Sequence, residues 1–228
     1  LPFPLSLPFS QTYPLCCMDI RSLVEQYYSF SSGMTQYHQD IDLILTQSLD
    51  DLLIQQISIN IRDTVEESTN LSQIAQIIVN IEHFQLACSE LERWLSESRT
   101  PNPGSRLALG ASEHLSTTLE IAQKRIDSAM FVKLDQFLDL LEYDWMPIQS
   151  ASMQRQPSSY LRDLIDWLST MMESALVLLP KVAKDATFTS CFMHISNRLL
   201  NSALLDRQVK MINLAALTNL DVDITFVY

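Results

Sequence analysis

Glycine is almost absent from this chain, and its scarcity limits the folds open to the sequence. Three glycines, Gly33, Gly104 and Gly110, occur among 228 residues. Hairpin turns and phosphate-binding loops depend on glycine, so neither a sheet rich in hairpins nor a nucleotide-binding loop is expected. Long helices joined by few loops need little glycine. The sequence therefore favours an all-α fold.

Apolar residues recur at spacings of three and four over most of the chain, which is the pattern of amphipathic helices. The proline-rich residues 1–18 are expected to form an extended lead-in, and 221–228 a frayed end. Between them, helices are expected over about 19–31, 41–61 (with 66 as an outer limit), 70–100, 112–141, 158–179, 181–205 and 206–217.

The segment from Tyr143 to Pro147, followed by a polar stretch to Pro157, is the best candidate for a domain boundary. It predicts a first helical bundle over 19–147 and a second over 158–228. No repeat at a fixed period is present, which disfavours helical-repeat arrays. Long helices with few connections favour antiparallel bundles stacked into a rod.

Sequence motifs for catalysis or metal binding are missing from the chain. No histidine is followed by a second histidine at helical spacing, and the four cysteines include no CxxC pair. The acidic pairs Asp50–Asp51 and Glu66–Glu67 are expected on solvated helix faces, where nothing would shift a carboxyl pKa. The sequence predicts a protein that is not an enzyme, without metal or cofactor.

The charge of the chain also limits the classes of partner that it is expected to bind. The net charge is −12 and no cluster of Lys and Arg occurs, so neither nucleic-acid binding nor adhesion to anionic lipid is expected. No run of eighteen apolar residues occurs, so no direct membrane insertion is expected. Scattered cysteines suit a reducing compartment, which predicts a cytoplasmic location. A basic protein partner is compatible with the charge.

Two local features leave alternatives open. Tyr143, Asp144 and Trp145 could form a recognition surface, or Trp145 could fill a gap between two bundles while Asp144 caps the next turn. In the helix over 181–205, Ala186, Ser190, Met193, Asn197 and Leu200 are expected on one inward seam, with Asn197 and Ser190 bonded to a neighbouring helix.

Six blocks of sequence occur in a characteristic order along nearly the whole chain: LPFSQTYP (7–14), SQIAQIIVNIEHFQLACSELE (72–92), EYDWMP (142–147), SSYLRDLIDWL (158–168), LLPKVA (178–183) and DRQVKMINLAALTNLDVD (206–223). Together they resemble the C-terminal region of the exocyst subunit Sec-fifteen, exocyst complex component six in animals, and 7–17 resembles fungal members. The family commonly has a glycine between Pro180 and Lys181, so this turn is expected to differ.

The resemblance implies helical bundles of the multisubunit-tether type and a role in tethering secretory vesicles during exocytosis. It implies that the C-terminal region is an effector of a GTP-loaded Rab GTPase and that other exocyst subunits, particularly Sec-ten, are partners. The protein would be recruited to secretory vesicles and to sites of polarised exocytosis at the plasma membrane. The family continues beyond residue 228, so the second bundle is expected to be truncated. The alternative is a purely structural rod that contacts other tether subunits.

The resemblance also implies where the Rab contact lies, within the segment 205–222. The candidates are Met211, Leu214, Ala215, Thr218, Asn219 and Asp221. A helix with an apolar stripe edged by polar groups suits the switch surface that GTP orders in a Rab. The alternative is that both apolar faces of this helix are buried in the bundle.

Overall fold

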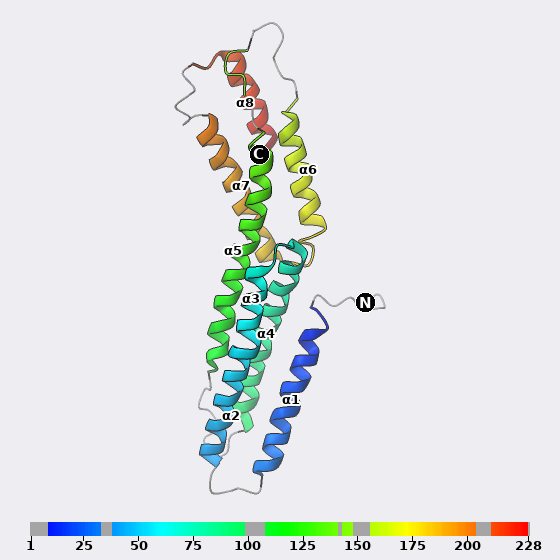
Figure 1. Ribbon diagram of the computed structural model, residues 1–228, viewed down its shortest axis with the longest axis vertical. Helices are drawn as coiled ribbons and strands as arrows, with labels where there is room; N and C mark the ends of the chain where they lie inside the picture. Colours follow the sequence, from blue (N-terminus) through cyan, green and yellow to red (C-terminus); the bar gives the residue numbers. More distant parts are fainter. Residues whose placement is uncertain are drawn as a thin grey trace. The chain divides into compact units, whose positions relative to one another are not determined.

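The computed structural model describes residues 9–32, 38–98, 108–140, 143–147, 156–203 and 211–227. All regular secondary structure in these ranges is helical, which confirms the all-α prediction for them (Figure 1). The chain divides into two compact units, Leu1–Arg125 (unit 1) and Ile126–Tyr228 (unit 2). The division falls inside one long helix, α5. The bundle limits predicted at 147 and 158 remain a prediction.

Unit 1 is built from α1 (Thr12–Ser31), α2 (His38–Leu52), η1 (Leu53–Ser58), α3 (Ile59–Glu67), α4 (Leu71–Ser98) and the first part of α5 (Gly110–Leu138). The elements α2, η1 and α3 follow one another without a break, so they form one helical run. This run begins at His38 and ends at Glu67, so it is longer than the helix predicted over 41–61 and ends near the outer limit of 66. Asn70 caps the start of α4, because its side-chain oxygen accepts hydrogen bonds from Ser72 N at 3.0 Å and Gln73 N at 3.3 Å.

The extended lead-in predicted for 1–18 is wrong for residues 12–18, which belong to α1. Pro14 lies in the first turn of the helix, where a missing N–H costs nothing. The segment before it is fixed on α4, since Ser10 N donates to Asn80 Oδ1 at 3.0 Å and Asn80 Nδ2 donates to Ser10 Oγ at 2.9 Å. Proline in this position starts a helix and does not exclude one.

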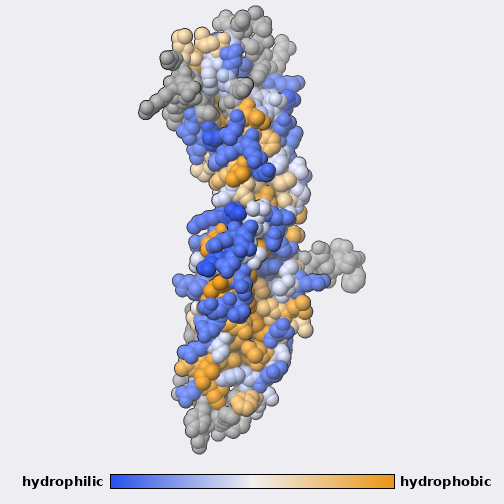
Figure 2. All heavy atoms as spheres, viewed as in Figure 1, coloured by the Kyte–Doolittle hydropathy of each residue, from blue (hydrophilic) through white to orange (hydrophobic). Residues whose placement is uncertain are grey.

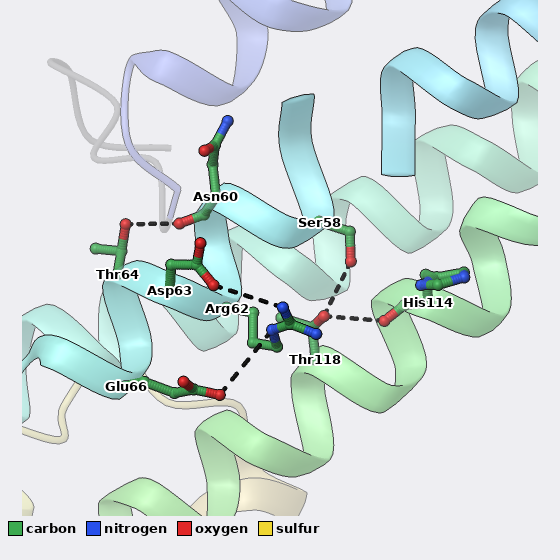
Figure 3. Close-up of polar contacts among 8 residues, drawn as sticks. All are labelled: Ser58, Asn60, Arg62, Asp63, Thr64, Glu66, His114 and Thr118. Atoms are coloured by element: carbon green, nitrogen blue, oxygen red, sulfur yellow. Dashed lines mark hydrogen bonds and ion pairs between the residues drawn. The ribbon is translucent and has the colours of Figure 1, made fainter. Parts of the chain in front are cut away.

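The middle of the α2–α3 run is a π-helical segment, η1, which the apolar spacing did not reveal. At its last residue, the buried hydroxyls of Ser58 and Thr118 lie 2.9 Å apart, and Thr118 also donates to His114 O at 2.9 Å (Figure 3). Arg62 pairs with Asp63 and Glu66 on the exposed side of α3 (Figure 3). The buried hydroxyl pair thus links η1 to α5 within an otherwise apolar core.

The start of α5 is bound by carboxylates from two other helices. Asp50 accepts hydrogen bonds from Gly110 N at 3.0 Å and Ala111 N at 2.8 Å. Glu92 Oε1 accepts from Leu109 N at 2.7 Å and Ser112 Oγ at 3.2 Å. Free N–H groups at a helix start favour negative charge, so both carboxylates stabilise this end of α5. Asp50, predicted only to lie on a solvated helix face or end, thus also caps the start of α5.

Unit 2 contains the rest of α5, α6 (Ser159–Glu173), α7 (Lys181–Ala203) and α8 (Leu214–Val227). α6 ends before the predicted 179, and turns connect it to Pro180. α7 has the predicted extent but the opposite rotation. Its buried face holds Thr187, Cys191, Ile195 and Leu199, whereas Met193 is 62% exposed and Asn197 is exposed.

The inward seam predicted for α7 is thus wrong, because polar cross-links fix the other face. His194 Nε2 lies 2.8 Å from Asp135 Oδ1, and its ring stacks on Phe131 with centroids 4.3 Å apart. Arg198 also bonds Asp135, with Nε and Oδ1 3.0 Å apart. These contacts between α5 and α7 hold Met193 and Asn197 on the outside.

Candidate partner-binding site

The helix α8 begins at a single residue that also holds the Tyr143–Pro147 segment. Asn213 Oδ1 accepts a hydrogen bond from Ala216 N at 2.9 Å and so caps the helix. The backbone N of Asn213 donates to Trp145 O at 3.1 Å, and its Nδ2 donates to Pro147 O at 2.8 Å. The start of α8 is therefore fixed by three bonds from one asparagine.

Near its other end, α8 is held by a buried carboxylate. Asp223 is 0% exposed and accepts hydrogen bonds from Tyr143 OH at 2.5 Å, Ser158 N at 2.7 Å and Ser158 Oγ at 2.6 Å. Tyr160 OH in turn donates to Tyr143 OH at 3.0 Å. A buried charge is tolerated when it is fully hydrogen-bonded, as it is here. The Asp223 cluster (Tyr143, Ser158, Tyr160 and Asp223) thus joins α8, the start of α6 and the 143–147 segment.

The two tyrosines of the Asp223 cluster remain protonated donors at neutral pH. Burial, together with the hydrogen bond to Asp223, raises the pKa of Tyr143 far above its usual range. Burial raises the pKa of Tyr160 to about 12. The cluster therefore keeps its donors over the whole physiological pH range.

The 143–147 segment was predicted either to form a recognition surface or to have Trp145 fill a gap while Asp144 caps a turn, and it matches neither alternative completely. Asp144 caps its own turn, since Oδ1 accepts from Met146 N at 3.0 Å. Tyr143 contacts Asp223, and the Trp145 ring packs 5.1 Å from the Tyr143 ring. The segment therefore contributes Tyr143 to the support of α8.

The outer face of α8 (Leu214, Leu217, Asp221 and Ile224) is open to solvent, as is Met211 just before the helix. Leu214 is 69% exposed, Met211 67% and Leu217 47%. The four positions within α8 are three or four residues apart, which puts a mainly apolar stripe with one carboxylate on the side away from the core. Among the described residues, the helix therefore has one supported face and one free apolar face.

The six predicted Rab-contact residues divide between the two faces of α8. Met211, Leu214 and Asp221 are exposed, and Thr218 is half-buried with its hydroxyl donating to Leu214 O at 2.9 Å. Ala215 and Asn219 are buried, at 3% and 9% exposure. The structure thus brings four of the six to or near the open side and places Ala215 and Asn219 in the packing of unit 2.

The predicted bounds of this helix are wrong. A helix was expected over 206–217 with a frayed end at 221–228, whereas α8 runs from Leu214 to Val227. Residues 204–210 lie outside the described part of the chain. The cap at Asn213 sets the start of α8, and the Asp223 cluster stabilises its last turns. Sequence reasoning missed Asp223, although its spacing from Ala216 and Leu220 puts an acid on the buried stripe.

Where side chains are described, no three His, Cys, Asp or Glu come together to hold a metal ion. No helix in the described ranges combines the length and hydropathy needed to cross a membrane. The free cysteine Cys191 is buried, and burial raises its pKa to about 12.

Comparison with known proteins assigns the whole chain to one family. The family model described as "Exocyst complex subunit Sec15 C-terminal" matches residues 1–228. The chain is 26% identical to mouse exocyst complex component 6B over 98% of the chain, and 25% identical to the exocyst complex component SEC15 of Saccharomyces cerevisiae over 99%. It is 28% identical to the Arabidopsis thaliana exocyst complex component SEC15B over 97% of the chain.

The chain spans about a quarter of these relatives: 27% of the mouse protein, 24% of the yeast protein and 28% of the plant protein. No solved structure matches the chain significantly. A family model that covers every residue, and relatives from animals, yeast and plants that align over nearly the whole chain, agree on the assignment. The chain belongs to the Sec15 C-terminal family of exocyst subunits.

Proposed function

We propose that this chain acts in vesicle tethering as part of an exocyst subunit, and that it binds a GTP-loaded Rab GTPase through the outer face of α8. Membership of the Sec15 C-terminal family supports the exocyst part of this proposal. The relatives bear exocyst names and are longer than the chain, so their role is carried over to it as a proposal. In this role the protein would act on the cytoplasmic side of secretory vesicles and of the plasma membrane.

One observation carries the Rab part of the proposal: an exposed apolar stripe lies on a helix whose opposite face is firmly held. The outer face of α8 presents Leu214, Leu217 and Ile224 to solvent, while Asp223 on the opposite face is fully buried. A helix fixed in advance loses little conformational entropy when a partner docks on it. The apolar stripe suits the partly apolar switch surface of a GTP-loaded Rab, and Asp221 supplies a charged edge.

Ala215 and Asn219 take a different role in this proposal from the one first expected. Both are buried, so they set the rotation of α8 within unit 2 and do not contact the Rab. Met211, Leu214 and Asp221 remain as direct contacts, with Thr218 at the edge of the surface. Leu214 is the most exposed large apolar residue of the outer face and therefore the best position for a test.

Leu214→Asp should weaken binding of the GTP-loaded Rab about tenfold or more, because it replaces the most exposed apolar side chain of the stripe by a charge. Val182→Asp is a matched control, since Val182 on α7 is 82% exposed and lies outside α8. Binding of the chain to a panel of secretory Rab proteins is measured by titration, with a GTP analogue and with GDP. The proposal fails if the GTP and GDP forms bind equally, or if the two aspartate variants bind alike while both remain folded.

A second candidate is a structural module that contacts other tether subunits such as Sec-ten. Exposed apolar residues of unit 1 favour it: Phe30 is 72% exposed, and Ile44 and Leu43 are also open. Binding to purified exocyst subunits that does not depend on nucleotide and does not change in Leu214→Asp would support this candidate. The two functions use different surfaces, so one chain could be tested for both in parallel.

A further inference from the structure

Unit 1 contains an apolar groove that its own fold leaves open, with a volume of about 380 Å³. One wall is a stripe on α4 formed by Phe84, Ala87, Cys88, Leu91 and Trp94. These residues recur at spacings of three and four, so they form one continuous face of the helix. From Phe84 to Trp94 the stripe is about 15 Å long at 1.5 Å per residue, which matches about three turns of a docked helix.

The opposite wall of the groove comes from α1, and part of the lining packs against the buried core. Cys17 and Ile20 from α1 face the α4 stripe. Ile20, Leu91 and Trp94 also pack against the buried core cluster that includes Val24 and Leu95. Apolar residues gather over α1 and the helices beside it in the lower part of the view in Figure 2. The groove is thus formed by residues that the core already holds in place.

The rim carries charges that are largely paired within the chain. Arg21 Nε lies 2.8 Å from Glu25 Oε1, and Arg93 Nη2 lies 2.6 Å from Glu90 Oε2. Arg93 also approaches Glu97 at 3.6 Å. Both arginines that line the groove are therefore neutralised by carboxylates, and they leave little positive charge to attract an anionic ligand.

The surroundings of the groove are negative. Unit 1 holds fifteen acidic and seven basic side chains, a net charge of −8. On the α4 wall, burial raises the pKa of Cys88 to about 12, and the carboxylates of Glu92 and Asp50 act in the same direction. The thiol is thus a neutral apolar lining group, and the potential around it favours cations.

We propose that the α1–α4 groove binds a basic amphipathic helix of a partner protein. Apolar side chains of that helix, at positions i, i+3, i+4 and i+7, would lie on the α4 stripe. Its lysines and arginines would lie near the exposed rim, where the three carboxylates Glu25, Glu90 and Glu97 outnumber the two arginines that they pair with, in a unit with a net charge of −8. Charge complementarity selects this occupant over an acidic helix, and the site is separate from the Rab surface on α8.

The test uses the whole chain and a fluorescent peptide of about 18 residues, with leucines on one helical face and lysines on the other. A second peptide has glutamate in place of every lysine. Ala87→Arg puts a long cationic side chain into the groove at a half-buried position, whereas Ser89→Arg adds the same charge to the exposed surface of the same helix outside the lining. Binding is measured by fluorescence anisotropy, and self-association by analytical ultracentrifugation.

The basic peptide should bind the unaltered chain and the Ser89→Arg variant with similar affinity, and Ala87→Arg should lower the affinity about tenfold or more. The acidic peptide should not bind. The proposal is overturned if the two arginine variants bind the basic peptide equally, since binding would then reflect net charge alone. It is also overturned if the acidic peptide binds as well, if neither peptide binds, or if the chain forms a dimer that only Ala87→Arg disrupts, because a second copy would then occupy the groove.

Discussion

Asp223 shows how one side chain can determine which face of a helix is free. Its carboxylate has three hydrogen-bond donors and no exposure to solvent. Rotation of α8 would separate the carboxylate from these donors and leave a buried charge without partners, which is costly. The open position of Leu214 is therefore a consequence of the buried position of Asp223 on the same helix.

Asp223→Ala should lower the free energy of unfolding of unit 2 by about 2–4 kcal/mol, because Tyr143 and Ser158 lose their buried acceptor. Asp221→Ala, two positions away on the exposed side, should change it by less than about 0.5 kcal/mol. Urea denaturation, followed by tryptophan fluorescence, measures the free energy of unfolding of each variant. The chain also carries Trp94→Phe, so that the remaining tryptophans, Trp145 and Trp167, both lie in unit 2. Equal losses in the two variants would contradict the role assigned to Asp223.

Individual residues were predictable where the signal was local. Asn70 lies directly before an apolar stripe, a local sign of a helix cap, and its side chain caps α4. Ser158 lies in the same kind of position before α6, but its hydroxyl donates to Asp223, far away in sequence. A hydrogen bond from a hydroxyl to a buried carboxylate contributes more stability than one that caps an exposed helix end. No local sequence pattern reveals which of the two bonds Ser158 forms.

At the scale of elements, α5 depends on carboxylates that come from α2 and α4. Asp50 and Glu92 bind the free N–H groups at the start of α5, so one helix is capped by two others. Gly110 leaves room for this contact, because a Cβ there would lie 3.0 Å from Asp50 Oδ2. The packing of unit 1 and the start of α5 are therefore coupled.

Asp50→Ala should destabilise the first turn of α5 by about 1 kcal/mol, since two backbone donors and the helix dipole lose their negative partner. Amides near residue 110 should then exchange hydrogen about fivefold faster in the native state. Asp51→Ala removes an exposed carboxylate next to it in sequence and serves as the control. Unchanged exchange in Asp50→Ala would show that Glu92 alone stabilises this helix start.

The extents of α4 and α7 were predicted well, whereas the rotation of α7 was not. The bounds of α4 and α7 followed from caps and prolines, which are local signals. The rotation of α7 was not predictable, because the sequence offers two stripes and the choice depends on Asp135 and Phe131, far away in sequence. The start of α8 was misplaced for a similar reason, since Asn213 bonds residues of the 143–147 segment.

At the scale of the whole molecule, the two units offer different surfaces. Unit 1 is strongly acidic and carries the open groove on α1 and α4, whereas unit 2 carries the exposed apolar face of α8. The family assignment rests on the entire chain, so it does not by itself indicate which unit meets which partner. In the two proposals, unit 2 binds the Rab and unit 1 binds a basic helix of another protein.

Hydrogen exchange of the whole chain, with and without a secretory Rab, tests the central claim most directly because it locates the contact. With the Rab bound to a GTP analogue, slower exchange should be confined to unit 2 and centred on residues 211–227, and it should be absent with GDP. Protection that lies in unit 1 instead, or that is the same for both nucleotides, would contradict the assignment of the Rab surface to α8.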